Sequence, residues 1–546
     1  MRKTHKFTML LMTLAMIATL FAGCGSKDNA SEGNTGTTTE GKSSTVSSNE
    51  DPFKEHLDIS VAFWDIDQVA EKWDKDPIFQ DLMKKFNITI KPVNVTWDDY
   101  VQKFQMWAAS GQLPDIFATD AIGTQYYRNW VNQGIVKALP EDMSKYPSLA
   151  EYFETPDIKG LSENGKFYNI PRRMFPTVDW SVLDRVVMYR WDLAQKAGIT
   201  KEPETWDEFK TMLQAIVDKD PEGKHVTGLT SSTTKMIGGF FWLYGNPAAT
   251  SDGSGSDFKW IKEDGKFVPA VFSSKALPAL QNMRDMFDHK LVDPDIALTK
   301  PDTAYDKFVS GKSAALLAGG GFLGVDQNIY EKRWKTAYPN VDFTQNVKVL
   351  KPMVGPDGER YHPVFKTYWS ESYFNAKIDD KKLDRILRLY DYILSPEGND
   401  LLTYGIKDVD YKVEGDKKVP IGDTSLNEKY PAKGFLMNLV TYNTSNAYDM
   451  NNPTIANKAI RQEAVDFIDW SIKNSKVPDY DIRLTYMSTP TKDKFSVLDH
   501  DDLLNIMLSK DPVDKAWENT LNNYKAKGLD KMIEEVNAKA KEQGIE

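Results

Sequence analysis

Between residues 57 and 119 the chain alternates between two apolar patterns. Residues 57–64, 88–95 and 116–119 read as strands, whereas residues 69–86 and 100–107 carry apolar side chains at helical spacing. Strands that alternate with helices in this way are joined by right-handed crossovers, so the pattern predicts a parallel sheet. The fold class expected from this region is α/β.

The residues at the carboxyl ends of these strands are the first candidates for a binding site. In an open parallel sheet, ligands bind beyond this edge. Trp64 ends the first strand, Asp65 follows it, and Asp120 follows the third strand. We therefore expect these three side chains to lie where a ligand would approach the sheet.

The remainder of the chain mixes both patterns and becomes rich in helices toward its end. Strands are expected over residues 186–189, 313–318 and 364–374. Thr205 and Glu208 form a capping-box pattern that opens a helix reaching about residue 217. From residue 383 onward the expected elements are mainly helices.

The first 24 residues have the pattern of a secretory leader. Arg2, Lys3 and Lys6 precede an apolar run over residues 7–21, which is shorter than the roughly 20 residues of a bilayer-spanning helix. The run closes on Leu20-Phe-Ala-Gly-Cys24, which resembles the lipobox of a bacterial lipoprotein signal. We expect cleavage after residue 23 and acylation of Cys24, for example with palmitate. An ordinary buried cysteine after an uncleaved anchor is the alternative.

Residues 24–51 predict a flexible tether. The segment after Cys24 is almost wholly Ser, Thr, Gly, Asn, Asp, Glu and Lys, so it cannot bury enough apolar surface to fold. The whole chain has a net charge of −11, which argues against nucleic acid as a partner and against electrostatic adsorption to anionic lipid. The lipid on Cys24, the only cysteine in the sequence, is therefore the expected anchor to the extracellular face of the cell membrane.

Aromatic residues next to polar ones are the main indication of a ligand. A sugar ring offers C–H faces for stacking and hydroxyl groups for hydrogen bonds. Singly, each aromatic residue is more often part of a core; together, at strand ends and glycine loops, some are expected to face a cleft. The predicted ligand-binding residues are Trp64, Asp65, Asp120, Arg172, Trp242, Tyr244, Trp369, Glu371 and Tyr373.

Metal and cofactor sites have weak support. The six histidines are isolated, so no metal site and no cofactor are predicted. Asp218, Asp220 and Glu222 place an acidic residue at every second position, which suggests a calcium loop. The later ligands of a full loop are missing, and a solvated helix end is the alternative. Residues 319–324 match a dinucleotide fingerprint, with a close approach of glycine backbone as the other interpretation.

Catalysis also has little support. No nucleophile motif is present, and Asp120 with Glu371 is only one of many carboxylate pairs that a glycoside hydrolase could use. We therefore expect no enzyme. A secreted polysaccharide-degrading enzyme, or a surface lipoprotein that binds peptides or serves sensing, stays open as an alternative.

Several short motifs, in their order along the chain, resemble a known family. After the lipobox they are Ser110-Gly-Gln-Leu-Pro-Asp-Ile-Phe117, Pro203-Glu-Thr-Trp-Asp-Glu-Phe209, Gly311-Lys-Ser-Ala-Ala-Leu-Leu317, Ser395-Pro-Glu-Gly398 and the stretch 517–535. The chain resembles extracellular solute-binding protein family 1, the sugar-binding lipoproteins of ABC importers. Within it, the resemblance is to the large lipoproteins of sporulating Gram-positive bacteria.

This resemblance implies a periplasmic-binding-protein-like fold with two lobes, a hinge and an oligosaccharide clasped between them. The lobes are expected at residues 52–171 plus about 307–370, and at 172–306 plus 371–546. The resemblance also implies a monomer that delivers its ligand to the membrane subunits of an ABC permease. Alginate-binding relatives carry a calcium loop after the helix that begins near Thr205, and here that segment is too short for the loop.

Overall fold

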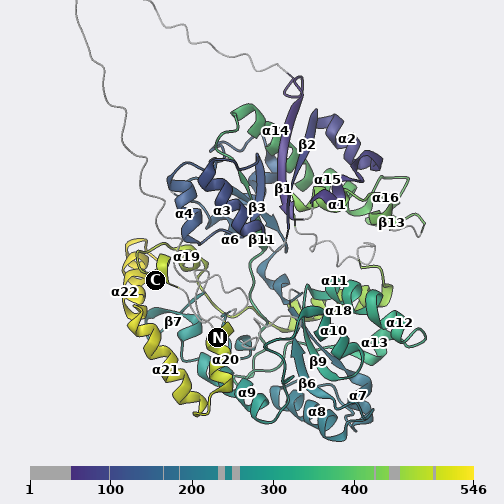
Figure 1. Cartoon of the computed structure of the whole chain (residues 1–546), viewed down its shortest axis with the longest axis vertical. Helices are drawn as coiled ribbons and strands as arrows, with labels where there is room; N and C mark the ends of the chain where they lie inside the picture. The colour runs from purple at the N-terminus through teal and green to yellow at the C-terminus, as the bar shows by residue number, and fades with distance from the viewer. Residues whose placement is uncertain are drawn as a thin grey trace, which may run out of the picture. The chain divides into compact units, whose positions relative to one another are not determined.

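The computed structural model describes residues 51–546 except 65, 97–98, 164, 184, 232–239, 249–258, 423–425, 442–454 and 496–499. The chain divides into residues 1–51 and 52–546, and all described residues except Asp51 belong to the second unit (Figure 1). The predicted leader, Cys24 and all but the last residue of the predicted tether lie outside the described residues, as does Asp65. Within the described part of the chain, no helix has the length and apolarity needed to span a bilayer.

The first sheet has the strand order β2-β1-β3-β11-β4. Its strands are β1 (Leu57–Trp64), β2 (Ile88–Val95), β3 (Ile116–Thr119), β4 (Asn169–Arg173) and β11 (Tyr368–Phe374). β1 pairs in parallel with β2 and with β3, as the alternating pattern predicts. β11 enters from far along the chain and runs antiparallel to both β3 and β4.

The helices beside this sheet differ from the sequence pattern at one point. The continuous helix expected over residues 69–86 is divided into α1 (Ile66–Ala70), the short η1 (Trp73–Lys75) and α2 (Pro77–Phe86). The Asp76 carboxylate accepts from the N–H of Phe79, and Pro77 occupies the first turn of α2. A new helix starts there because proline fits the first turn but removes a hydrogen-bond donor from a helix interior.

Elements from the later part of the chain complete the core of the first sheet. α14 (Asp380–Leu394), α15 (Pro396–Tyr404), α16 (Leu426–Lys429) and α17 (Lys433–Asn438) bury side chains in one hydrophobic cluster with β1, β2 and β3. This cluster also contains residues of α3 (Tyr100–Ser110), α4 (Gln125–Asn132), α5 (Pro147–Phe153) and α6 (Pro156–Lys159). A hairpin of β12 (Tyr411–Glu414) and β13 (Lys417–Pro420) follows α15.

The second sheet has the order β10-β5-β9-β6. It consists of β5 (Arg185–Arg190), β6 (Thr227–Ser231), β9 (Ser313–Gly319) and β10 (Val347–Val349), with β6 parallel to β9. Alternate residues of β5 enter different clusters: Val187 packs with α8 (Trp206–Lys219) and α9 (Ala276–Asp288), and Val186 packs with α10 (Pro301–Val309) and α18 (Lys458–Asn474). The sheet is thus covered on both faces, and Figure 1 shows α8 and α10 beside β6 and β9.

The capping box predicted at the start of α8 is present. The Thr205 side chain accepts from the N–H of Glu208, and the Glu208 carboxylate accepts from the N–H of Thr205. The helix ends at Asp220, which has a left-handed backbone conformation. Both ends of α8 are therefore set by local sequence.

The remaining described elements connect or cover these layers. A small pair of strands, β7 (Trp260–Glu263) and β8 (Lys266–Pro269), packs with α22 in a separate cluster. The others are η2 (Val178–Leu183), α7 (Trp191–Lys196), η4 (Phe241–Tyr244), η5 (Ala270–Phe272), α11 (Gly321–Gly324), η6 (Val325–Trp334), α12 (Lys335–Ala337), α13 (Phe343–Asn346), α19 (Ile482–Tyr486), η7 (Lys492–Lys494), α20 (His500–Leu508), α21 (Val513–Ala526) and α22 (Leu529–Glu542).

The strands of the two sheets do not follow the lobe boundaries expected from the sequence. Those boundaries join residues 307–370 to the first sheet and residues 371–546 to the second. The pairing instead places β9 in the second sheet, and it places β11, with α14 and α15, beside the first. β9 and β11 are both largely buried strands, so their sequences alone do not indicate which sheet they join.

Candidate functional site

Trp64 and Trp369 lie together at one edge of the first sheet. Trp64 ends β1, and Trp369 is near the start of β11, which runs in the opposite direction. The amino end of an antiparallel strand lies beside the carboxyl ends of its parallel neighbours, so the two residues reach the same edge. Their ring centroids are 5.6 Å apart at an angle of 43°, and Tyr100 lies 5.5 Å from Trp64. Both tryptophans are half-buried.

A buried arginine contacts both tryptophan rings. Arg172 on β4 is fully buried, and its guanidinium carbon lies 4.8 Å from the centroid of Trp64 and 5.5 Å from that of Trp369. It donates to the Ser370 hydroxyl (3.0 Å) and to the backbone carbonyl of Asn438 (3.3 Å). The cation therefore fixes the position of both rings through contacts with their faces and with β11.

Asp120 lies at the same edge, just after β3, and forms an ion pair. The ammonium of Lys366 is 3.3 Å from its carboxylate, and both side chains are partly exposed, 13% for Lys366 and 21% for Asp120. The hydroxyl of Tyr126 donates to the Asp120 carbonyl (3.0 Å). This pair offers one acceptor and one donor that a ligand can reach.

Glu371 and Tyr373 come from the same strand but point into the interior. Glu371 is fully buried and accepts from the N–H of Ala121 (2.9 Å) and the hydroxyl of Tyr373 (2.9 Å). Burial, and then the nearby Asp120 carboxylate, raise the pKa of Glu371 to about 8. Tyr373 is itself enclosed by aromatic rings, of which Phe117 stacks at 5.5 Å. Direct ligand contact by these two residues stays a prediction; in the structure they hold the turn that carries Asp120.

Trp242 and Tyr244 belong to a different part of the molecule. They lie on η4 and pack, half-buried, on the cluster of the second sheet that includes α8 and α9. The ring of Trp242 is 5.3 Å from Phe240, and the Tyr244 hydroxyl accepts from the Asn282 amide. Their contact with a ligand also stays a prediction.

Several residues at the first site carried no signal in the sequence. Tyr100, Lys366 and Ser370 contact the predicted residues directly, and Arg185 on β5 lies 5.5 Å from the ring of Phe365. Lys366 and Phe365 come just before β11, so only the position of that strand in the first sheet brings them to this edge. Trp369 also packs against the cluster formed by β5, β9, α10 and α18. The site thus lies where the cores of the two sheets meet.

The acidic residues after α8 are already engaged. The Asp220 carboxylate accepts from the backbone N–H groups of Lys224 (3.0 Å) and His225 (2.9 Å). Glu222 forms ion pairs with Lys196 and Lys224. These contacts close the loop at the helix end. The described residues include no group of three His, Cys, Asp or Glu arranged for a metal ion.

The glycines after β9 allow a close approach within the chain itself. A Cβ atom on Gly324 would lie 2.7 Å from the carbonyl oxygen of Gly319. The last residue of α11 therefore packs directly on the end of β9, which requires glycine at this position.

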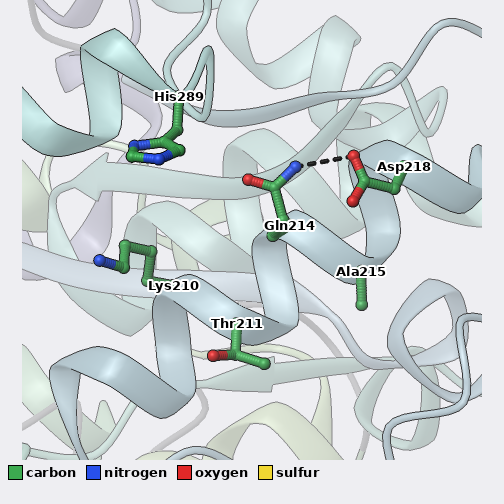
Figure 2. A pocket seen from close by; sticks show the side chains of 6 residues that line it. All are labelled: Lys210, Thr211, Gln214, Ala215, Asp218 and His289. Atoms are coloured by element: carbon green, nitrogen blue, oxygen red, sulfur yellow. Dashed lines mark hydrogen bonds between the residues drawn. The ribbon is translucent and has the colours of Figure 1, made fainter.

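A separate pocket lies on the outer side of α8. Figure 2 shows its lining side chains, with Gln214 donating to Asp218 (2.7 Å) and His289 on the opposite wall. Its volume is about 360 Å³, and Lys210, Thr211 and Ala215 complete the lining. None of the predicted ligand-binding residues lines this pocket.

Comparisons with known proteins agree with this architecture. The family described as bacterial extracellular solute-binding protein matches residues 69–400. Lipoprotein LipO from Bacillus subtilis is 23% identical over 348 residues, which cover 62% of this chain and 65% of LipO. The polygalacturonan/rhamnogalacturonan-binding protein YtcQ from the same organism is 23% identical over 356 residues, covering 63% of this chain and 65% of YtcQ. The chain thus matches slightly less than two thirds of the length of either relative.

Solved structures extend the likeness to nearly the whole chain. The ABC-transporter substrate-binding protein FusA of Streptococcus pneumoniae, in complex with kestose, superposes with a TM-score of 0.63 at 16% identity and covers 90% of this chain and 99% of FusA. At this identity the likeness shows the fold. The predicted periplasmic-binding-protein-like α/β fold is confirmed.

Proposed function

The chain belongs to the bacterial extracellular solute-binding protein family, and from this premise we propose that it binds an oligosaccharide outside the cell and delivers it unchanged to an ABC importer. The family predicted from the sequence motifs is confirmed by this match. The oligosaccharide, the importer and the residues that grip the ligand are the proposed part.

The arrangement of Trp64, Arg172 and Trp369 carries the proposal. Two half-buried indole rings, supported by one buried cation, present apolar faces at the edge where open α/β sheets bind ligands. Such faces stack on the C–H faces of sugar rings. Beside them, Asp120 can accept from a sugar hydroxyl and Lys366 can donate to one.

The relatives support the choice of ligand and partner. YtcQ is named for binding polygalacturonan and rhamnogalacturonan, and FusA is named as an ABC-transporter protein and holds kestose. The saccharides named for these two relatives thus include some with carboxylate groups and some without them. Kestose and an oligogalacturonide are therefore the first probes for this chain.

Closure of two lobes is the mechanism that we propose. The first lobe consists of the first sheet with the segments that share its core, about residues 52–173 and 368–441. The second consists of the second sheet with its covering helices, about residues 174–367 and 455–546. A ligand that contacts both lobes favours the closed state, by no more than its difference in affinity for the two states. Trp242 and Tyr244 would then meet the ligand from the second lobe.

Anchoring through Cys24 is the localisation that we propose. The lipobox sequence and the likeness to a protein named lipoprotein support it. In a Gram-positive host grown with labelled palmitate, the full-length chain should carry the label and stay with the membrane. The C24S variant should lose the label, and equal labelling of C24S would contradict the anchor.

A hydrolytic function is less well supported by the geometry. The predicted carboxylate pair would need both groups to reach the substrate. Asp120 is partly exposed, but Glu371 is fully buried behind it. Binding without turnover therefore fits this edge of the sheet better.

Thermal unfolding in the presence of saccharides tests the proposal. Kestose, trigalacturonate and a rhamnogalacturonan fragment are added in excess, and the products are analysed for new reducing ends. A ligand at a hundredfold excess over its Kd stabilises the folded state by about 2.7 kcal/mol. Stabilisation with unchanged saccharide is expected. Release of reducing ends at catalytic rates would overturn the binding function, as would the absence of any shift with all three probes.

A further inference from the structure

The carboxyl group of Glu371 is bound asymmetrically. Its Oε2 atom accepts from the N–H groups of Ala121 (2.9 Å) and Ile122 (3.4 Å) and from the Tyr373 hydroxyl (2.9 Å). Its Oε1 atom is buried, and among the residues that the structure describes it has no hydrogen-bond partner. One oxygen thus accepts three hydrogen bonds, while the other is buried and accepts none from the described residues.

This asymmetry favours a proton on Oε1. An ionised carboxylate with one bare oxygen loses its hydration and gains no replacement there, whereas a neutral carboxyl group avoids most of that cost. The negative charge of Asp120 acts in the same direction. Burial and Asp120 together raise the pKa of Glu371 to about 8, so the group is neutral through the acidic and neutral pH range.

Burial and the charge of Asp120 oppose ionisation of Glu371, whereas the charge of Lys366, the N–H of Ala121 and the hydroxyl of Tyr373 assist it; burial is the largest of these effects. Lys366 is the cation whose charge lowers the pKa of Glu371, and it is already paired with Asp120 at 3.3 Å. The charged and titratable side chains that face or flank the carboxyl group are Asp120 after β3, Lys366 and Tyr373 before and on β11, Arg172 and Arg173 on β4, Tyr100 on α3, Tyr126 and Tyr127 on α4, and Tyr152 on α5.

We propose that Glu371 is a positioning residue that carries a proton when a saccharide binds, and that loss of this proton weakens binding at the edge formed by Trp64, Asp120 and Trp369. The inference rests on the proposed function. The neutral carboxyl group holds the turn over residues 120–122 through Oε2 while leaving Lys366 on Asp120. An ionised Glu371 competes for Lys366 and repels Asp120, so the acceptor and donor at the ligand edge lose their alignment.

The pH dependence of affinity tests this proposal. Affinities for kestose and trigalacturonate are measured calorimetrically between about pH 6 and about pH 9, where neither probe titrates. If only the protonated form binds, the wild-type affinity falls about tenfold over this range. In E371Q the amide cannot ionise. For each probe, the affinity at about pH 6 divided by the affinity at about pH 9 is therefore expected near one, whatever the affinity itself. A flat wild-type profile, or an equal fall in E371Q, overturns the proposal.

Glu463 on α18 provides a matched control. Burial raises the pKa of this second glutamate to about 7, but it lies beside β10 in the second sheet. E463Q should therefore show the wild-type fall in affinity. A flattened profile in E463Q would overturn the assignment of the proton to Glu371.

Stability provides a readout that needs no ligand. An unfolded glutamate has an ordinary pKa of 4.5, whereas the pKa of Glu371 in the folded protein is about 8. Between these values the folded protein holds a proton that the unfolded chain has released, so the free energy of unfolding falls as the pH rises through this window. E371Q should lack this part of the slope. An unchanged slope in E371Q would contradict the inference that Glu371 holds a proton in the folded protein.

Two further outcomes separate the inference from the proposed function. If no saccharide binds at any pH, the proposed function and the link to a ligand both fail, while the unfolding profiles still decide whether Glu371 holds the proton. If E371Q does not fold, infrared titration of the wild type replaces it: a protonated carboxyl band should vanish near pH 8. Absence of that band at neutral pH overturns the proposal.

Discussion

Two groups of aromatic residues look alike in the sequence and differ in the structure. The first aromatic group is Trp64 and Trp369 at the edge of the first sheet, and the second is Trp242 and Tyr244 on η4. Rings of the first group contact the guanidinium of Arg172, whereas Trp242 rests on Phe240 and Tyr244 bonds to Asn282. The two rings of the first group thus share one buried cation, whereas each residue of the second group has a separate, uncharged neighbour.

Among the changes that test this contrast between the two aromatic groups, removing Arg172 is expected to have the largest effect. R172A takes away a fully buried cation, its bonds to Ser370 and Asn438, and its contacts with both rings. We expect the free energy of unfolding to fall by about 3 kcal/mol, because buried acceptors and a cavity remain. Affinity for the bound saccharide should fall at least tenfold, or about 1.4 kcal/mol. Chemical unfolding and calorimetry measure the two effects.

R172K is the matched control for this position. It keeps the charge but lacks the planar fork that bonds Ser370 and stacks on the rings. An intermediate loss of affinity is expected. Unchanged saccharide affinity in R172A would show that the rings of the first aromatic group need no support from the cation. The contrast between the two groups would then disappear.

Truncating the half-buried rings of Trp64 and Trp369 is expected to have the next largest effect. W64A and W369A each remove one stacking face, and we expect each to weaken binding by about tenfold, in the range of aromatic hot spots. Each variant should stay folded, as circular dichroism would show, because both rings are half-buried. W369F should recover part of the affinity by restoring an aromatic face. If W64A and W369A unfold instead, the rings belong to the core.

Trp242 should have a smaller effect on binding. One face of its ring is already packed near Phe240, so less of it is available to a ligand. W242A is expected to weaken binding by about fivefold, or about 1 kcal/mol. Calorimetry beside W369A gives the comparison directly. A larger loss in W242A than in W369A would reverse the ranking of the two groups.

Tyr244 should give the smallest effect. Y244F removes the hydroxyl that accepts from Asn282 and leaves the ring in place. The expected change in the free energy of unfolding is about 1 kcal/mol, typical of one hydrogen bond. A change in affinity greater than about threefold would show that the hydroxyl itself meets the ligand. N282A should match Y244F in stability, because it breaks the same bond.

Local sequence predicted the elements whose signals lie within the element. β1, β2 and β3 follow their alternating patterns, and β1 is parallel to both β2 and β3 as predicted. The capping box of Thr205 and Glu208 is also present. The division at Asp76 and Pro77 was readable in principle, because a capping aspartate followed by proline is a helix start.

The arrangement of the site required information that no single segment contains. Lys366 reaches Asp120, and Arg172 reaches Trp64, only because β11 joins the sheet beside β3 and β4 joins it beside β11. Glu371 lies two residues after Trp369, and regular alternation would place both side chains on one face. The pairing of β11 with β4 shifts register between Tyr368 and Glu371, however, and Glu371 is fully buried. The partners of a strand thus decide which of its residues meets the ligand.

From the sequence by itself, periodicity indicated the α/β class and the resemblance of several short motifs indicated the family, because both signals are local. The sequence also marked the aromatic residues that could serve a sugar. The tertiary structure decided which sheet β9 and β11 join, which rings rest on Arg172, and which carboxylate is buried. Those outcomes depend on pairing between residues that are as far apart as Ala121 and Glu371 along the chain. Burial there sets both the position and the charge of a side chain, and burial is a property of the folded whole.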